Sequence, residues 1–328
     1  MDCLRAQAMN TVFSSQYQLF RSNWAGDPTT GDGKPLPRLP TGSVADPALS
    51  PHGLNQAREL AAHLTAASTG GDALLPVERI YCSPYYRCLE TVQPLVEAVI
   101  ETNLSSPQPV RCEPGLVDWF GPAPSNHPPP LSAAELQSQF FPWIDPSYEP
   151  SGLGPAQQSQ GESMAQLHAR LAAVIDGIVR QCDAEGVRSV LLCTHAAPII
   201  ALGRVLTGAV PADVGAPDFG VFTCGLSVFR RRRDAKVTPT ATAVPWDDPL
   251  QTLAKVSWTN GRGIQGGWDC TVNCDCSFLS GGEERGWRFS AEDESPEAME
   301  RHRQGIVDAG LELGVVVVGR TKNSVLSV

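Results

Sequence analysis

The stretch Leu191-Leu192-Cys193-Thr194-His195-Ala196-Ala197-Pro198-Ile199-Ile200 decides the fold of this chain. An apolar run from Val190 to Cys193 ends abruptly at Thr194 and His195, and an apolar stretch with a proline near its start follows. This pattern is typical of a buried strand that delivers a histidine to its carboxyl end, just before a helix begins. In open α/β sheets, ligands bind at such strand ends, where a helix N-terminus offers free N–H groups to an anion.

The composition narrows the class of protein. The chain has 328 residues, of which 42% are hydrophobic, so it can bury one substantial core and a smaller second one. Its net charge of −10 argues against direct binding to nucleic acid or to anionic membranes, since both need a basic face. We see no membrane span and no apolar signal core at the N-terminus. We therefore expect a nuclear or cytoplasmic protein, in which the 10 cysteines stay reduced.

Further strand–helix pairs surround the opening stretch. Ser50 and Pro51 are typical of a helix cap and first helical position, and Ser83-Pro84 repeats this pattern directly after an apolar run. Arg87 therefore falls in the first turn of a helix, near a strand's carboxyl end. We predict strands at residues 77–82, 110–112, 187–193 and, at the sheet edge, 225–229, and helices from 50, from 83 to 101, at 162–183 and at 197–206.

Two regions give weaker signals. Residues 1–20 show no clear element, and residues 121–160, rich in proline and serine, suit a lid or excursion more than a core element. After the basic run Arg230–Arg233 the composition changes, so we place a domain boundary there. The run is interpreted either as a nuclear-import signal or as a solvated linker.

The predicted organisation has three parts. Residues 1–233 form the α/β domain, residues 234–290 form a small antiparallel β domain, and residues 291–328 form a helical or partly disordered tail. Cys270, Cys274 and Cys276 do not have the spacing of a zinc site, and we predict no metal and no cofactor.

Arg87 and His195 both follow predicted strands, and together they predict a phosphate pocket. A guanidinium offers paired donors to phosphate oxygens, and a histidine beside it can donate to the phosphate or attack it.

Three motifs in order carry a resemblance to a known family. They are Leu49-Ser50-Pro51-His52-Gly53-Leu54-Asn55-Gln56-Ala57, Ser83-Pro84-Tyr85-Tyr86-Arg87-Cys88-Leu89-Glu90-Thr91 and Cys193-Thr194-His195-Ala196. With them the chain resembles the histidine phosphatase (phosphoglycerate mutase-like) superfamily over about residues 19 to 229. The resemblance implies a three-layer α/β/α sandwich, followed here by the small C-terminal antiparallel β domain. It also implies that Arg21, Arg87 and His195 bind phosphate.

The resemblance implies two catalytic residues here, His195 and Asp118. In the family a loop glutamate usually serves as general acid, and Gly115-Leu116-Val117-Asp118-Trp119 occupies that loop. Asp118 keeps a carboxyl group, one methylene shorter, which can protonate a leaving oxygen if its pKa is raised.

The family's nucleophile is missing. Its first strand ends in Arg-His-Gly, and that histidine is phosphorylated during turnover, but this chain contains no Arg-His-Gly. Arg21-Ser22-Asn23-Trp24 resembles the piece that follows the motif, which puts Gln18 where the nucleophilic histidine belongs. A glutamine amide cannot carry a phosphoryl group in this way. Either the catalytic function is lost, or the first twenty residues are not those of the native protein.

A narrower resemblance concerns the phosphatase-like tau subunits of the fungal transcription factor IIIC. The segments 21–24, 46–54 and 115–122 resemble their phosphatase-like domain, and residues 274–287 resemble the small β (triple-barrel) segment joined to it. This implies a partner, another transcription-factor subunit, bound through residues 234–290.

Two functions remain open, and with them whether the chain is an enzyme. One is a phosphatase-like assembly subunit that retains the pocket but turns over weakly or not at all. The other is an active phosphomonoesterase, acting on a phosphorylated small molecule or phosphoprotein, whose native N-terminus differs from this one.

Overall fold

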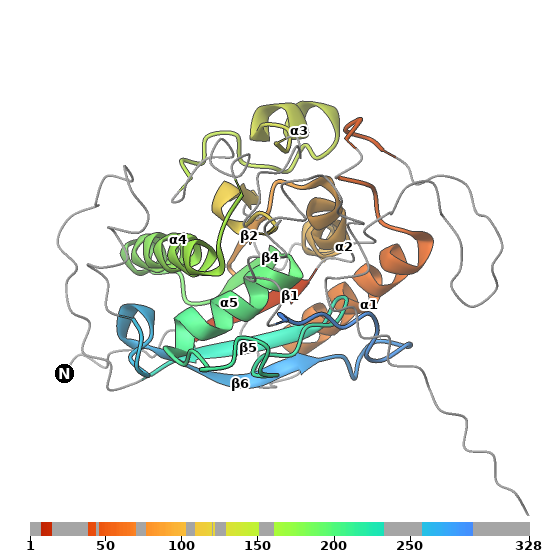
Figure 1. The fold of residues 1–328 in the computed structure, drawn as a ribbon. Coiled ribbons are helices and arrows are strands. Elements are labelled where there is room, and N and C mark those ends of the chain that lie inside the picture. The colour runs from red at the N-terminus through yellow and green to blue at the C-terminus, as the bar shows by residue number, and fades with distance from the viewer. Residues whose placement is uncertain are drawn as a thin grey trace, which may run out of the picture.

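The structure, a computed structural model, describes residues 8–14, 39–43, 46–69, 77–102, 109–119, 121, 129–150, 161–232 and 258–290. Within these residues one mixed sheet runs through the molecule (Figure 1). Its strands are β1 (Ala8–Ser14), β2 (Arg79–Cys82), β3 (Arg111–Cys112), β4 (Val190–Thr194), β5 (Leu226–Arg231) and β6 (Trp268–Asp275). The α-helices are α1 (Pro51–Thr69), α2 (Tyr86–Thr102), α3 (Ala133–Gln139), α4 (Met164–Glu185) and α5 (Ala196–Thr207), and two 3₁₀ turns are η1 (Pro114–Leu116) and η3 (Ile264–Gly266).

The strand order is β3-β2-β4-β1-β5-β6. β3, β2, β4 and β1 are parallel to one another, whereas β5 is antiparallel to both β1 and β6. The parallel strands therefore end at one edge of the sheet, and that edge receives the residues that follow β2 and β4.

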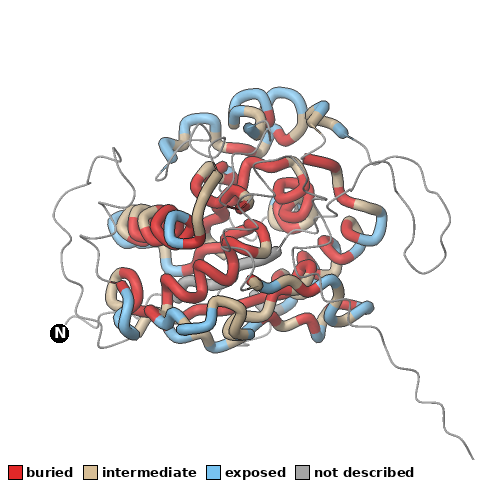
Figure 2. The backbone as a smooth tube through the Cα atoms, viewed as in Figure 1, coloured by how far each residue is buried: buried red, intermediate tan, exposed pale blue. Residues whose placement is uncertain are grey.

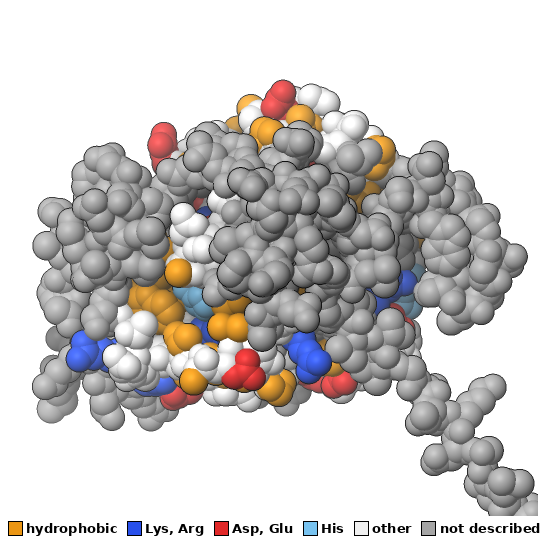
Figure 3. Space-filling view, viewed as in Figure 1, with side chains coloured by type: hydrophobic (Ala, Val, Ile, Leu, Met, Phe, Trp, Pro, Cys, Tyr) orange, Lys and Arg blue, Asp and Glu red, His pale blue; other side chains and the backbone are white. Residues whose placement is uncertain are grey.

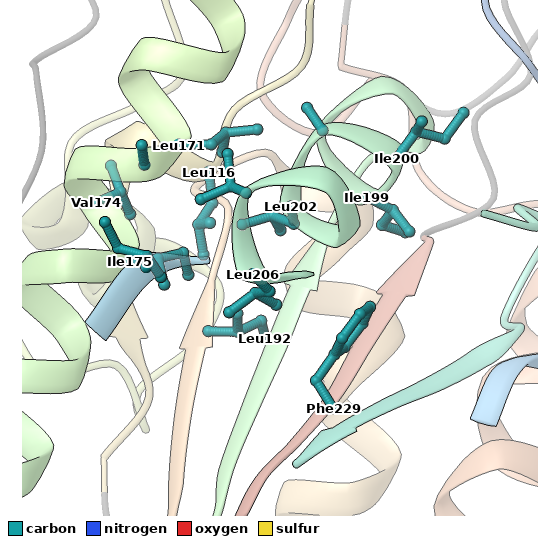
Figure 4. Close-up of a cluster of buried hydrophobic side chains, with 14 of the residues drawn as sticks. Leu116, Leu171, Val174, Ile175, Leu192, Ile199, Ile200, Leu202, Leu206 and Phe229 are labelled. Atoms are coloured by element: carbon teal, nitrogen blue, oxygen red, sulfur yellow. The ribbon is translucent and has the colours of Figure 1, made fainter. Parts of the chain in front are cut away.

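Helices cover both faces of the sheet, as the two hydrophobic cores show. Tyr81 and Leu192 point to the face covered by α4 and α5, whereas Ile80 and Leu191 point to the face covered by α1 and α2. Figure 2 shows buried residues along the central helices and strands, and Figure 4 shows side chains of α4, α5 and the sheet packed together. The predicted α/β/α sandwich is confirmed, and the C-terminal antiparallel pairing is present.

Local sequence explains where the helices begin and end. The Gly53 N–H donates to Ser50 Oγ at 3.1 Å at the start of α1, as the cap pattern predicts. Helix α4 starts with a capping box between Ser163 and Gln166 and stops at Gly186, whose φ of 71° lies in the left-handed region that favours glycine.

Three predicted features are corrected. Residues 8–14 form β1, although residues 1–20 gave no strand signal. β5 is not an edge strand, because β6 from the C-terminal segment pairs with its outer side. The region 121–160 is more than an excursion, since residues 129–150 include helix α3 and place Leu136, Phe141 and Ile144 in the core.

Two arginines of the basic run, at the end of β5, bind partners in the described part of the chain, and both interpretations of the run stay predictions. Arg231 Nη1 donates to Asp183 at 2.7 Å, and its guanidinium lies over the Trp268 ring. Arg232 bonds Asp269 at 2.8 Å and the carbonyl oxygen of Gly261 at 2.7 Å. On the face shown in Figure 3, basic side chains around β5 and β6 alternate with acidic and apolar ones.

The described C-terminal segment, residues 258–290, also packs on α1. Glu284 accepts hydrogen bonds from His52 Nε2 at 2.5 Å and from Gln56 Nε2 at 3.1 Å, and Phe278 stacks on His63. Through β6 and these contacts the segment continues the α/β sheet. The division at residue 233 stays a prediction, and the proposed tail at 291–328 lies outside the described residues.

Among the described helices, none combines the length and apolar character needed to cross a membrane.

Candidate functional site

His195 follows β4 directly and takes the N-cap position of α5, with an extended backbone (φ −113°, ψ 172°). Its side chain makes no capping bond, so the ring is free to turn into the sheet edge, where it is 1% exposed. Ser83 Oγ lies 2.8 Å from Nε2, and Arg87 Nη2 lies 3.2 Å from Nδ1. Because a guanidinium only donates, Nδ1 accepts and the ring proton sits on Nε2, which donates to Ser83.

Arg87 sits in the first turn of α2, as predicted, and is fully buried. Its Nη2 lies 3.1 Å from Asp118 Oδ2 and its Nη1 lies 3.4 Å from Asp46 Oδ1. The guanidinium carbon stands 4.4 Å from the centroid of the Tyr85 ring. The structure thus brings together three predicted site residues, Arg87, His195 and Asp118. The distance from His195 Nδ1 to Asp118 Oδ2 is 3.4 Å.

The loop that presents Asp118 is held from several sides. Thr194 Oγ1 donates to the Leu116 carbonyl at 2.5 Å, and Arg170 Nη1 donates to the carbonyls of Gly115 and Val117 at 2.7 and 3.1 Å. Asp118 Oδ1 accepts the N–H of Trp119 at 2.9 Å. The backbone at this position is therefore fixed, and Oδ2 is the atom that faces Arg87 and His195.

Three residues of the site were missed as site residues by sequence reasoning. Asp46 accepts the backbone N–H of Tyr86 at 2.8 Å and so anchors the start of α2 beside Arg87. Ser83 was noted only as a helix start, and Cys88 Sγ lies 3.4 Å from His195 Nε2. A usable signal existed for Ser83 alone, since a polar side chain directly after a buried strand shares the sheet edge with His195.

Burial governs the charges of the site. It raises the pKa of Asp46 and of Asp118, although Arg87 opposes the rise in both cases. It lowers the pKa of His195, which favours the neutral ring. The cluster of Arg87, His195, Asp46 and Asp118 therefore combines a permanent cation with two carboxyl groups that protonate more easily than usual.

Two predicted positions stay untested. Gln18 and Arg21 lie outside the described residues. β1 ends at Ser14, whose partner in the neighbouring strand β4 is Thr194. The last residue of β1 therefore lies one position before the level of His195. Among the described residues, no group of three or more His, Cys, Asp or Glu side chains is placed to hold a metal ion.

Comparisons with known proteins agree with this geometry. The profile of the histidine phosphatase superfamily (branch 1) matches residues 38–241, and the chain belongs to this superfamily. It is 29% identical over 287 residues to the transcription factor tau 55 kDa subunit of Saccharomyces cerevisiae. The aligned region covers 86% of this chain and 59% of that protein. It is 32% identical over 184 residues to the ecdysteroid-phosphate phosphatase of Drosophila melanogaster, covering 54% of this chain and 22% of that protein.

The chain thus spans less than two thirds of the length of these relatives. Among solved structures, ecdysone phosphate phosphatase from Bombix mori, crystallised with tungstate, has the same fold. The TM-score is 0.51 at 17% identity, covering 73% of this chain and 98% of the other.

Proposed function

We propose that this chain is a phosphatase-like subunit of a transcription factor of the IIIC type, with a pocket for phosphate groups and weak or no turnover. One observation carries the proposal: the similarity to the tau 55 kDa subunit extends over 86% of the chain, well beyond the part shared with the fly phosphatase. The chain would then be a pseudoenzyme in the nucleus of a fungus.

The pocket part of the proposal depends on Arg87 and His195. Both are buried at the carboxyl edge of the parallel strands, 3.2 Å apart, where an anion also meets the N-terminus of α5. Arg21 would join them from a segment outside the described residues. Phosphate transfer needs a nucleophile in addition to the groups that bind phosphate. Gln18 stands at the predicted nucleophile position, and its amide cannot carry a phosphoryl group.

The partner would be another subunit of the factor, bound through residues 234–290. Within the described part of this segment, Asp269, Thr271 and Asn273 are exposed on β6. β6 is one of the two outer strands of the described sheet, and an outer strand offers backbone donors and acceptors to a second chain.

The second candidate is an active phosphomonoesterase. The 32% identity to the ecdysteroid-phosphate phosphatase favours it, as do the retained Arg87 and His195. In such an enzyme Asp118 would protonate the leaving oxygen, and its burial-raised pKa suits that role. The substrate would be a phosphorylated small molecule or a phosphoprotein.

One pair of assays separates the candidates. The full chain is incubated with p-nitrophenyl phosphate, with His195→Ala as control, and is separately co-expressed with the other subunits of the factor and tested for co-elution. Co-elution with no turnover is expected. Turnover that His195→Ala abolishes would establish the esterase, and failure to co-elute with any subunit would overturn the subunit proposal.

A further inference from the structure

We propose that Asp118 is an internal ligand of the pocket, and that a phosphate-like anion enters by displacing its carboxylate from Arg87, beside His195. This rests on the phosphate pocket of the proposed function, and it adds what controls access to that pocket.

The geometry of one oxygen atom carries the proposal. Asp118 Oδ2 lies 3.1 Å from Arg87 Nη2 and 3.4 Å from His195 Nδ1, and those two nitrogens are 3.2 Å apart. A phosphate that accepts from this arginine, and donates from a protonated oxygen to this histidine, would place its oxygens beside the same two nitrogens. The carboxylate already fills that position, so the two anions exclude each other.

Displacement needs a movement of the side chain only. The backbone around Asp118 is fixed by Arg170 and Thr194, and the Trp119 indole Nε1 donates to the Glu162 carbonyl at 2.7 Å. The side chain of Asp118 is 12% exposed, whereas that of Arg87 is fully buried and that of His195 is 1% exposed. Asp118 is therefore the member of the trio that faces outward, and its rotation would open the way to the other two.

The second carboxylate on Arg87 has a different role. Asp46 accepts the backbone N–H groups of Tyr86 and Arg87 at 2.8 and 3.5 Å, in addition to its contact with Nη1. These bonds tie Asp46 to the start of α2, so it stays in place and holds the guanidinium when Asp118 leaves. Within the described residues, Asp46 makes neither a hydrogen bond nor an ion pair with His195, so it is a matched control for the charge alone.

The exchange depends on pH. Asp118 faces Arg87 from α2, His195 after β4 and Arg170 from α4, and Asp46 shares Arg87 with it. Burial raises the pKa of Asp118, so its carboxylate takes up a proton as the pH falls toward that value. Protonation weakens its hold on Arg87, which a phosphate oxygen can then take over, while a protonated phosphate oxygen can donate to His195 Nδ1. Phosphate affinity should therefore increase at low pH.

The test is isothermal titration of inorganic phosphate into the full chain, for the wild type, Asp118→Asn, Asp118→Ala and Asp46→Asn, between pH 5 and 8. We expect both Asp118 variants to bind phosphate about tenfold tighter than the wild type at pH 7. The reason is that the charge-assisted bond between Asp118 and Arg87 no longer competes with phosphate. The gain should shrink as the pH falls toward the raised pKa of Asp118, because the wild-type carboxyl then becomes neutral. Comparing variants at equal pH cancels the titration of the phosphate itself.

Each other outcome overturns the proposal in a distinguishable way. If Asp46→Asn gains as much as Asp118→Asn, general electrostatics explains the effect and Asp118 is no internal ligand. If the wild type binds phosphate and neither Asp118 variant binds tighter, the internal ligand is refuted while the phosphate pocket stands. If no folded variant binds phosphate, the pocket of the proposed function fails as well. Circular dichroism establishes which variants fold, and Asp118→Ala provides a second reading if Asp118→Asn does not.

Discussion

Within the described residues, an arginine and a histidine are buried in contact at the strand edge, Arg87 and His195, and another arginine and histidine are buried two residues apart on α4. The two pairs behave differently. On α4, Arg170 is 4% exposed and His168 is 7% exposed. Arg170 binds Glu162 through two nitrogens at 2.7 Å and adds two carbonyl oxygens, so its donors meet short, fixed acceptors. At the strand edge, Arg87 meets its carboxylates at 3.1 and 3.4 Å.

The histidines differ in the same sense. His168 bonds the Met164 carbonyl through Nδ1 at 2.8 Å and stacks on Trp258, and its Nε2 has no hydrogen-bond partner among the described residues. His195 has neighbours at both nitrogens, and they include an arginine and a carboxylate. Burial of these residue types is therefore no sign of function. The contacts of Arg87 and His195 are longer and are shared among several partners. For this reason we expect Arg87 to exchange its carboxylate partner for another anion.

The largest expected effect is on the α4 pair. Replacing Arg170 by Met leaves Glu162 and two carbonyls without their donor, so we expect the free energy of unfolding to fall by about 3 to 5 kcal/mol. Denaturant unfolding measures it. The control is Arg188→Met, which removes an equally two-pronged but exposed pair with Glu78 and should cost at most about 1 kcal/mol. Equal losses in the two variants would mean that burial of the Arg170 pair is immaterial.

The second effect concerns pH. Burial lowers the pKa of His168 to about 4, below its ordinary value of 6.5. Between pH 6.5 and pH 4, His168 takes up a proton in the unfolded chain but stays largely neutral in the folded chain. The free energy of unfolding should therefore fall by about 3 kcal/mol as the pH drops from 6.5 to 4. His168→Phe should flatten that part of the stability profile. An unchanged slope in the variant would refute the role assigned to His168.

The third effect separates the two arginines by function. Arg87→Lys keeps the charge but loses the paired donors, so phosphate affinity should fall about tenfold in titration calorimetry. Arg170→Lys, which lies outside the pocket, should leave phosphate affinity unchanged in folded protein while lowering stability. If Arg170→Lys weakened phosphate binding as much, the distinction between the two pairs would collapse.

The smallest effect is on the support of His195. Ser83→Ala removes the acceptor of Nε2–H and should cost about 1 kcal/mol of stability, together with a loss of phosphate affinity of about threefold. Ser227, buried and bonded to the Cys274 N–H at 3.0 Å, supplies the matched control. Ser227→Ala should show the stability loss alone. If the two variants bound phosphate equally well, Ser83 would have no role in phosphate binding.

Most of the sandwich could be predicted from the sequence because its elements carry strong local signals. The apolar run before His195, the Ser-Pro helix starts and the amphipathic stretch at 162–183 each predict an element that the structure contains. Placing Arg87 and His195 at strand ends then follows from parallel topology, and their 3.2 Å contact agrees with it.

The rest depends on long-range pairing, which leaves no local mark. β1 holds its place through backbone bonds to β4 and β5, and β6 through bonds to β5, so neither needs a strong strand pattern of its own. Asp46 could not be predicted either, because an aspartate in a loop acquires its role only when α2 meets it. The roles of Arg231 and Arg232 likewise depend on residues 258–290, which the chain reaches later.

The place of β1 between β4 and β5 has a consequence for synthesis on the ribosome. β1 emerges well before its two neighbours, Val190–Thr194 and Leu226–Arg231, which follow only near the end of the α/β part. At roughly 5 to 20 residues per second, the first strand waits on the order of tens of seconds for partners. During that interval β2 and β3 can pair, while the middle of the sheet stays open. The nascent chain should therefore need a chaperone most while residues 15–190 are being made, and slow folding should track the closure of β1.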